Sequence, residues 1–191
     1  MKTNPMDELR LFISVNIDSP KITSEIAKFQ KKVSFRGVKV VKPDLFHFSL
    51  HFLGDTLKEV VPDIENIFSS IEQAPFTITM EGSGVFPSVH NIKVLWIGVS
   101  SGATELTSLQ RQFTQPLEKL HFKIDSRPYS PHLTIGRVKF LNPESKKAIQ
   151  EAVRDYQSVV FGSQEITKIH LMQSTLTPEG PIYQSLYSKD L

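Results

Sequence analysis

Hydrophobic residues follow two different periods along this chain, and each change of period marks a predicted element. Apolar residues that alternate with polar ones, or that form short unbroken runs, are typical of β-strands. Such segments lie at residues 9–15, 38–41, 46–53, 76–80, 94–99, 132–140, 159–161, 166–172 and 182–187. In four other segments the apolar residues recur three and four positions apart, as on one face of a helix. These predicted helices cover residues 20–33, 62–71 and 106–120, and the fourth begins after Asn142.

Polar and proline residues predict where several of these elements begin or end. Ser19 and Asn142 each precede a proline and are predicted N-caps, because a cap oxygen accepts from the first turn and proline suits the first helical position. Pro116 lies inside the third predicted helix and should kink it or end its first part. The glycine-containing stretch 82–87 is predicted to be a loop.

The order of the elements favours an α+β fold. Strands and helices alternate, yet several strands follow one another directly, which favours antiparallel sheets over a doubly wound parallel sheet. A chain of 191 residues suits one domain with room for two lobes. We therefore expect residues 1–191 to form a single α+β domain.

One four-residue phrase occurs twice. His47-Phe48-Ser49-Leu50 and His132-Leu133-Thr134-Ile135 both read histidine, apolar, hydroxyl, apolar, and their histidines are 132 − 47 = 85 residues apart. On a strand, residues i and i+2 point to the same face, so each histidine projects together with its hydroxyl while the apolar residues enter a core. Two such strands predict a pair of equivalent catalytic arms that face one cleft.

Composition narrows the compartment and the chemistry. The chain has no cysteine, which excludes disulfides, thiolate nucleophiles and cysteine-based zinc sites and fits a cytoplasmic protein. The first ten residues are polar without a signal-peptide core, and no apolar run approaches the ~20 residues of a membrane span. A net charge of +2 is too small for a general nucleic-acid coat but permits an anionic substrate that is bound locally.

Positive charge is concentrated in residues 21–42. Seven of these residues are lysine or arginine, and only Glu25 is acidic. The stretch is either a solvated helix face or a rim that attracts a phosphate backbone, and the sequence leaves both readings open.

The repeated phrase and its flanks resemble the paired H-x-(T/S)-x motifs of the two-histidine phosphoesterases. Within that superfamily the chain looks like the RNA 2′,3′-cyclic phosphodiesterases, also called 2′-5′ RNA ligases. The flanking matches are Leu9-Arg10-Leu11-Phe12-Ile13, Phe52-Leu53-Gly54-Asp55, Gly84-Val85-Phe86-Pro87, Arg127-Pro128-Tyr129-Ser130-Pro131 and Gly180-Pro181-Ile182-Tyr183. The resemblance extends from residue 9 to about residue 187. It implies a bilobal fold in which two antiparallel sheets line a central groove with helices outside.

The residue types suit the opening of a cyclic phosphate. A neutral imidazole can take a proton from water while a charged one gives a proton to the leaving oxygen, because the free pKa of histidine, ~6.5, lies near working pH. The hydroxyls of Ser49 and Thr134 can donate to the non-bridging phosphoryl oxygens. No metal or cofactor is required. Which histidine is acid and which is base does not follow from the residues; the resemblance implies His47 as proton donor to the 3′ oxygen, His132 as acceptor, and a 2′-phosphate product.

Two positions depart from the family pattern. Ser49 stands where threonine is usual, which keeps the hydroxyl but loses the β-branch that holds its rotamer. His51 stands where a basic residue such as lysine is frequent. By strand parity it shares a face with His47 and lines the groove; the other reading places it toward solvent farther along the strand.

Four further aromatic or charged residues are weighed as substrate contacts. Arg127 could pair a phosphate and Tyr129 could stack on a base, but either could simply brace the loop before the second motif. Phe12 is expected in the core rather than as a base platform, and Trp96 is expected in the core. The histidines without a motif, His90, His121 and His170, are expected to have structural or surface roles.

The leading functional prediction is hydrolysis of RNA 2′,3′-cyclic phosphate ends by two histidines. The expected partner is RNA with such ends, tRNA fragments among them, with no membrane, no obligate protein partner and a monomeric chain. Relatives in the same class join such ends as RNA ligases or cleave 2′-5′ oligonucleotides. A reading from another class is an RNA-end binding module without turnover, which only the serine at position 49 favours.

Overall fold

The computed structural model describes residues 7–191, so the first six residues of the predicted domain and of its polar N-terminal stretch lie outside the described part. The strands are β1 (Glu8–Asn16), β2 (Val38–Val40), β3 (His47–Leu57), β4 (Phe76–Ser88), β5 (Asn91–Ser101), β6 (Leu133–Val138), β7 (Val160–Ile166), β8 (Lys168–Thr177) and β9 (Gly180–Asp190). The α-helices are α1 (Pro20–Val33), α2 (Val61–Ser69), α3 (Ala103–Lys119) and α4 (Pro143–Asp155). Two short 3₁₀ helices, η2 (Pro43–Leu45) and η3 (Lys58–Val60), precede β3 and α2. The predicted order of helices and strands is confirmed.

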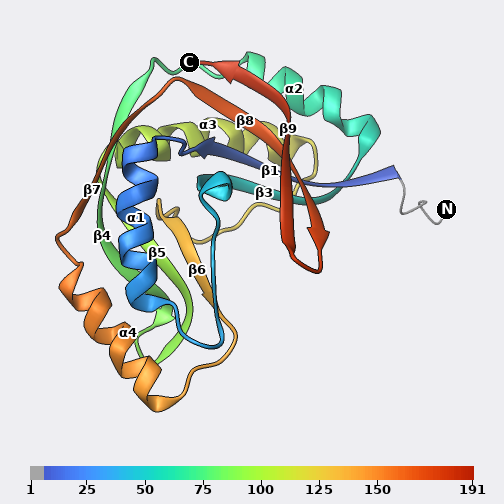
Figure 1. Ribbon diagram of the computed structural model, residues 1–191. Coiled ribbons are helices and arrows are strands. Elements are labelled where there is room, and N and C mark those ends of the chain that lie inside the picture. Colours follow the sequence, from blue (N-terminus) through green and yellow to red (C-terminus); the bar gives the residue numbers. More distant parts are fainter. Residues whose placement is uncertain (1–6) are drawn as a thin grey trace.

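The strands form one curled antiparallel sheet in the order β7-β4-β5-β6-β3-β1-β8-β9, with β2 paired to the outer part of β6 (Figure 1). The α+β class is thereby confirmed. The sequence predicts two sheets, but β3 and β6, the two motif strands, pair with each other and join all the strands into one sheet. This junction of β3 with β6 consists of one residue pair, Phe48 with Leu133. A division into two lobes stays a prediction.

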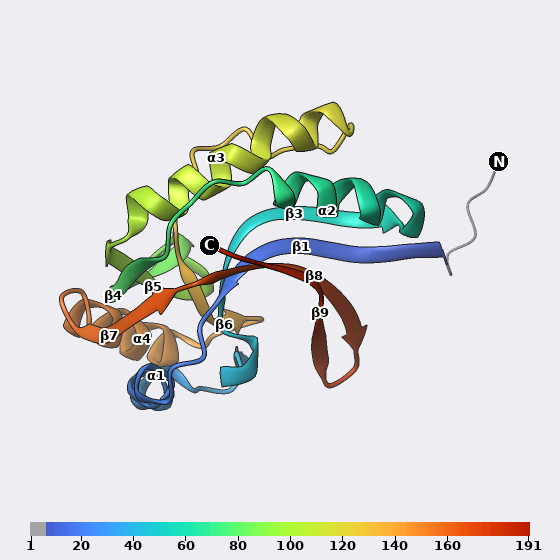
Figure 2. The ribbon, with the colours of Figure 1, turned by 90° about the horizontal axis from the view of Figure 1, so that it is seen from above.

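Two pairs of helices cover the sheet. Helix α1 packs against α4 and β7, whereas α2 packs against α3, which also contacts β3 (Figure 2). One hydrophobic cluster connects the helices with the sheet, and it contains the fully buried rings of Phe29 and Phe113 together with Leu133 and Ile135. Within residues 7–191 no helix is long and apolar enough to cross a lipid bilayer.

Several predicted boundaries differ from the structure. Residues 82–87 belong to β4 rather than to a loop, because the strand continues through irregular pairing and a positive φ of 75° at Gly82. Helix α3 continues past Pro116 for one turn, since a proline this close to the end disturbs few backbone bonds. Asn142 is confirmed as a cap, because its side chain accepts from the Ser145 amide at 2.7 Å.

The other predicted cap is replaced by a side chain from far along the chain. The hydroxyl of Ser19 makes no capping bond. Instead, Gln164 on β7 accepts with its Oε1 from the backbone amides of Asp18 and Ser19, and its Nε2 donates to the Asn16 carbonyl. Local sequence could not reveal a partner about 145 residues away.

Candidate active site

The first arm is built where η2 leads into β3. The ring of His47 bonds the Leu45 carbonyl through Nδ1 at 2.7 Å, and its Nε2 lies 3.0 Å from the Ser49 hydroxyl. Because a carbonyl only accepts, Nδ1 must carry the proton in the neutral ring. Nε2, which then carries a lone pair, accepts a hydrogen bond from the Ser49 hydroxyl. It is also the atom that can exchange a proton with a substrate.

The second arm repeats this local geometry. Nδ1 of His132 lies 2.8 Å from the carbonyl of Ser130, which again stands two residues before the histidine. Leu133 and Ile135 are fully buried, while His132 and Thr134 are partly exposed. The alternation predicted for this strand is therefore present, and Nε2 is again the free proton-transfer atom.

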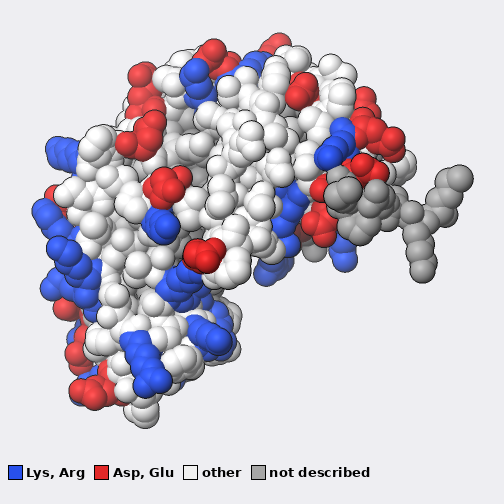
Figure 3. Space-filling view, turned by 45° about the vertical axis from the view of Figure 1, so that its right-hand side comes forward, with Lys and Arg blue, Asp and Glu red and all other residues white. Residues whose placement is uncertain are grey.

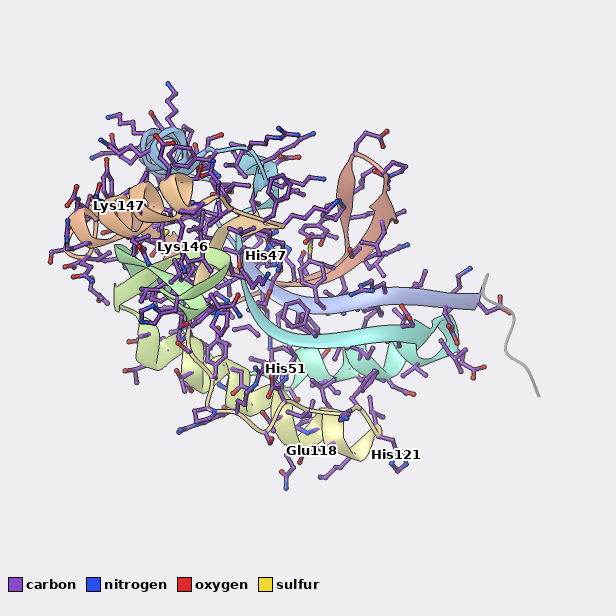
Figure 4. All side chains as sticks on the ribbon, turned by 90° about the horizontal axis from the view of Figure 1, so that it is seen from below. His47, His51, Glu118, His121, Lys146 and Lys147 are labelled. Carbon is purple, nitrogen blue, oxygen red and sulfur yellow. The ribbon has the colours of Figure 1, made fainter. Side chains whose placement is uncertain are left out.

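The two arms lie against each other in the sheet. Phe48 pairs with Leu133, and both side chains enter the core. The residues on either side of each point to the opposite face, which the two motifs therefore share. The antiparallel direction puts His47 on the side of Thr134 and Ser49 on the side of His132. Figure 4 shows His47 on the open side of these strands, beside the β8–β9 hairpin.

Aromatic rings pack around both imidazoles. The ring of His47 lies 5.0 Å from Phe12 and 5.4 Å from Tyr183, measured between centroids. His132 lies 5.0 Å from Phe86, with the two rings nearly perpendicular. Phe12 is 4% exposed and thus buried, but it lies on the site face and outside the main hydrophobic cluster, where it supports the histidine rather than offering a free face.

Positive charges act on the first arm. Burial of the ring lowers the pKa of His47, the charges of Arg137 and His132 lower it further, and the bond to the Leu45 carbonyl opposes them. Arg137 and Arg10 also lower the pKa of Tyr183, although burial of the phenol raises it overall. The structure therefore adds two arginines near the site that the sequence reading missed.

A β-bulge explains why Arg137 was missed. Strict alternation from His132 would put residue 137 on the core face. In the pairing with β5, however, Thr134 stands opposite Trp96 and Gly136 opposite Leu95, so Ile135 is an extra residue. The extra residue reverses the parity of the strand beyond it and returns Arg137 to the site face.

A second bulge corrects the groove reading of His51. In the pairing of β3 with β1, Ile13 stands opposite His51 and Ser14 opposite Ser49, which makes Leu50 the extra residue. His51 consequently points to the helix side, is 5% exposed and bonds the Gln110 carbonyl of α3 at 2.8 Å (Figure 4). Neither lining the groove nor facing solvent is correct.

The same bulge gives the site face an exposed aromatic ring. Phe52 stands opposite Phe12 in the sheet, with 6.3 Å between the ring centroids. Its side chain is 69% exposed. Phe52 lies in one of the flanking motifs, but strict alternation along the strand assigns the site face to its neighbour His51, so the sequence does not predict it as a substrate contact.

The two candidates before the second motif brace their own loop. Arg127 forms an ion pair with Asp125, with 2.5 Å between Nη2 and Oδ2, and this pairing lowers the pKa of Asp125 to about 2. The ring of Tyr129 packs against the core, and burial raises the pKa of its hydroxyl. Within residues 7–191 that hydroxyl has no hydrogen-bond partner. Bracing is thus the reading that the contacts of both residues favour.

Trp96 differs from the expectation that it lies in the core. It alternates with the fully buried Leu95 and Ile97 and stands opposite Thr134, so its ring lies on the site face. A Cβ on Gly84 would come within 2.1 Å of this indole, which explains the glycine of the G-x-F-P motif. Among the described residues, no group of three or more histidine, aspartate or glutamate side chains is placed to hold a metal.

A model of the AKAP7 2′5′ RNA ligase-like domain matches residues 11–191. The chain belongs to this family. The resemblance read from the two motifs is therefore confirmed, and membership of the 2′5′ RNA ligase-like family extends over almost the whole chain.

Relatives support the same assignment. A protein of Methanocaldococcus jannaschii, named RNA 2′,3′-cyclic phosphodiesterase, is 39% identical over 92% of this chain and 97% of its own. A protein of Archaeoglobus fulgidus with the same name is 40% identical over 93% of this chain and 98% of its own. Among solved structures, TT0787 of Thermus thermophilus superposes with a TM-score of 0.80 at 27% identity, covering 96% of this chain and 98% of its own. LigT of Escherichia coli, solved with 3′-AMP, has a TM-score of 0.77 at 21% identity over 96% and 98%, and shows the same fold.

Proposed function

We propose that this protein is an RNA 2′,3′-cyclic phosphodiesterase that opens cyclic phosphate ends by acid–base catalysis with His47 and His132. The observation that carries the proposal is the pair of matched arms, in which an imidazole and a hydroxyl stand on each of two adjoining strands and share one face. Relatives at 39% and 40% identity bear the name of this activity.

The chemical step follows from the free nitrogens. Nε2 of His132 takes a proton from water, and the water oxygen forms a new bond to phosphorus. The bond from phosphorus to the 3′ oxygen breaks, and that oxygen receives the proton from Nε2 of His47. Ser49 and Thr134 donate to the non-bridging oxygens, whose negative charge grows in the transition state. The product is a 2′-phosphate and a 3′-hydroxyl; the assignment of acid and base comes from the family resemblance.

A nucleobase has a candidate platform beside this centre. Phe52 presents an exposed ring on the site face, next to Phe12, whose ring touches His47. Stacking of a base on an exposed aromatic ring is a common form of RNA recognition and does not depend on sequence. We assign this role to Phe52 rather than to Tyr129.

The RNA chain has a candidate path along one rim. Lys39 stands opposite Arg137 where β2 pairs with β6, and Lys139 follows with its amide bonded to Gly37. Arg36 and Lys42, at either end of β2, are exposed as well. Figure 3 shows lysines and arginines gathered around the hollow of this face. These five residues, the basic rim, suit a phosphate backbone better than the outer face of α1 does.

Turnover of a nucleoside 2′,3′-cyclic phosphate tests the proposal. We expect hydrolysis that survives exhaustive EDTA treatment, phosphorus NMR that identifies a 2′-phosphate, and near-complete loss of rate in His47→Ala and in His132→Ala. A binding module would bind RNA ends without turnover. A 3′-phosphate product would reverse the leaving group, and activity restored only by a divalent ion would exclude the two-histidine chemistry. The cytoplasmic location, the monomeric state, tRNA fragments as substrate and a role in RNA processing stay predictions.

A further inference from the structure

The junction between the two catalytic arms has little direct support. Strands β3 and β6 share a single residue pair, whereas β1 and β3 pair along nine residues. One pair leaves the two strands free to pivot, and the arms must be held within a fraction of an ångström for proton transfer to both sides of a phosphate. Some other contact has to set their separation.

A buried glutamine on α1 bridges the segments that lead to and from the two motifs. Gln30 is 8% exposed, and its Nε2 donates both to the Val41 carbonyl at 2.8 Å and to the Ile135 carbonyl at 2.9 Å. The amide of Val41 also donates to the Ile135 carbonyl at 2.9 Å. A single side-chain nitrogen thus connects a helix, the chain that precedes β3, and β6.

Both carbonyls are close to catalytic groups along the chain. Val41 leads directly into η2, whose last residue, Leu45, supplies the carbonyl that orients His47. Ile135 is the bulge residue that follows Thr134 and that returns Arg137 to the site face. A shift of either carbonyl would move one arm relative to the other, although Gln30 itself contacts neither histidine.

We infer that Gln30 is a positioning residue, whose amide fixes the separation of the two catalytic arms at the junction of β3 and β6. The inference rests on the two-histidine mechanism proposed above. It differs from a purely structural role because it predicts a defect in the chemical step that depends on both arms being present.

The test replaces the amide by an apolar group of similar length. We expect Gln30→Met to lower kcat for a nucleoside 2′,3′-cyclic phosphate by about ten- to a hundredfold, because a small misplacement of catalytic groups is costly. KM should change by less than about threefold, since the phosphate ligands remain. Rates are compared per folded molecule, with the folded fraction measured by circular dichroism.

The matched control is Gln112→Met. Gln112 on α3 also makes two hydrogen bonds to backbone, accepting from the Glu72 amide and donating to the Glu72 carbonyl, but these exposed bonds connect α3 with the chain after α2 and not with either motif. Its kcat should stay within about twofold of wild type. An equal loss in both variants would reduce Gln30 to a general stabiliser.

A second background separates positioning from stability. In His132→Ala only one arm remains, so adding Gln30→Met should lower the residual rate by much less than it lowers the wild-type rate. The same factor in both backgrounds, or a wild-type kcat in Gln30→Met, overturns the inference. If Gln30→Met does not fold, Gln30→Asn, whose shorter side chain cannot reach both carbonyls, is held to the same criteria. Failure of the proposed function is visible separately, as absence of turnover in the wild-type protein or full turnover in His132→Ala.

Discussion

Each histidine of the site is oriented by the carbonyl of the residue two positions before it. This bond holds the proton of the neutral ring on Nδ1 and directs Nε2 to the shared face in both arms. Two equivalent nitrogens can then approach opposite sides of one phosphate. Their environments differ, because burial and the Arg137 charge lower the pKa of His47. The sequence repeat thus predicts the common geometry, while the surroundings distinguish the two rings.

Ser49 tests whether the small hydroxyl of the first arm serves the reaction. Ser49→Ala removes the donor that lies 3.0 Å from Nε2 of His47 and that would reach a phosphoryl oxygen. We expect kcat to fall on the order of 10²–10³, the typical cost of losing one preorganised donor. Ser49→Thr restores the hydroxyl and should retain most of the rate in the same steady-state assay. A wild-type rate in the alanine variant would show that this hydroxyl is not a phosphate ligand.

His51 tests the structural role that replaces its predicted place in the groove. Its pKa is lowered by burial, with the bond to the Gln110 carbonyl opposing the shift. The unfolded chain therefore binds a proton at higher pH than the folded protein does. The free energy of unfolding should therefore decrease as the pH falls from ~6.5, the ordinary pKa of histidine, toward the lowered pKa of His51 in the folded protein.

The measurement is the free energy of unfolding in urea between about pH 8 and pH 5, a range that brackets the ordinary pKa of histidine. In His51→Gln, which keeps a donor for the Gln110 carbonyl but does not titrate, the decline toward low pH should be shallower than in wild type. His47 and His170, whose pKa values are also lowered by burial, leave a residual decline. Parallel curves for the two proteins would contradict a neutral, buried His51.

At the scale of elements, two bulges separate what the sequence predicts from what it cannot. Alternation places His47, Ser49, His132 and Thr134 correctly, because each motif precedes the irregularity in its strand. The parity is reversed beyond Ile135 and between Leu50 and Leu53, where a further irregularity restores it, so the same rule misplaces His51 and Phe52 in β3 and Arg137 in β6. The bulges arise from pairing with other strands, and a single strand's sequence carries no signal for them.

The helices and the element order were predictable for a different reason. An apolar stripe repeats over several turns and tolerates a local error, as in α3, where the stripe continues on both sides of Pro116. Contacts between distant segments were not predictable. Gln164 replaces the cap expected from Ser19, and Gln30 spans 105 residues to reach Ile135.

Gly84 tests the packing of β4 beneath the second arm. In Gly84→Ala the new Cβ would meet the indole of Trp96 at 2.1 Å, and Trp96 packs against Phe86, which contacts His132. We expect a loss of about 1–3 kcal/mol in unfolding free energy, as for other overpacked sites, and a lower kcat. Because Trp96 is the single tryptophan, its fluorescence should shift as well.

The control for this substitution is Gly54→Ala. A Cβ at Gly54 meets no atom within 4 Å, so the variant carries only the strain of its positive φ of 72°. Tryptophan fluorescence and kcat should therefore follow wild type. An unchanged spectrum together with a wild-type kcat in Gly84→Ala would contradict the expected clash with the indole and its effect on the arm.

At the scale of the whole molecule, charge is distributed unevenly although the net charge is only +2. The triple variant Arg36→Gln, Lys42→Gln, Lys139→Gln neutralises part of the basic rim. It should raise KM for an oligonucleotide with a cyclic phosphate end and flatten its salt dependence, because fewer counterions are released on binding. KM for a mononucleotide cyclic phosphate should hardly change.

The control variant neutralises Lys21, Lys31 and Lys32 on the outer face of α1, where Lys32 lies 6.0 Å from the centre of the Tyr156 ring. Its salt dependence should match wild type. If this variant weakens oligonucleotide binding instead, the RNA follows the helix and not the rim.

The last prediction concerns the two histidines as one unit. Replacing both should cost little more than replacing one, because each proton transfer is useful only with the other. The profile of kcat/KM against pH should be a bell whose limbs report macroscopic ionisations of the free protein. His47, as the proton donor, acts in its charged form, so its ionisation sets the basic limb; burial and the Arg137 charge lower its pKa and bring that limb to lower pH. Arg137→Gln removes that charge and should move the basic limb to higher pH, whereas Arg127→Gln, whose partner is Asp125, should leave it in place. A limb that moves to lower pH, or a profile with only one limb, would contradict this assignment of the pair.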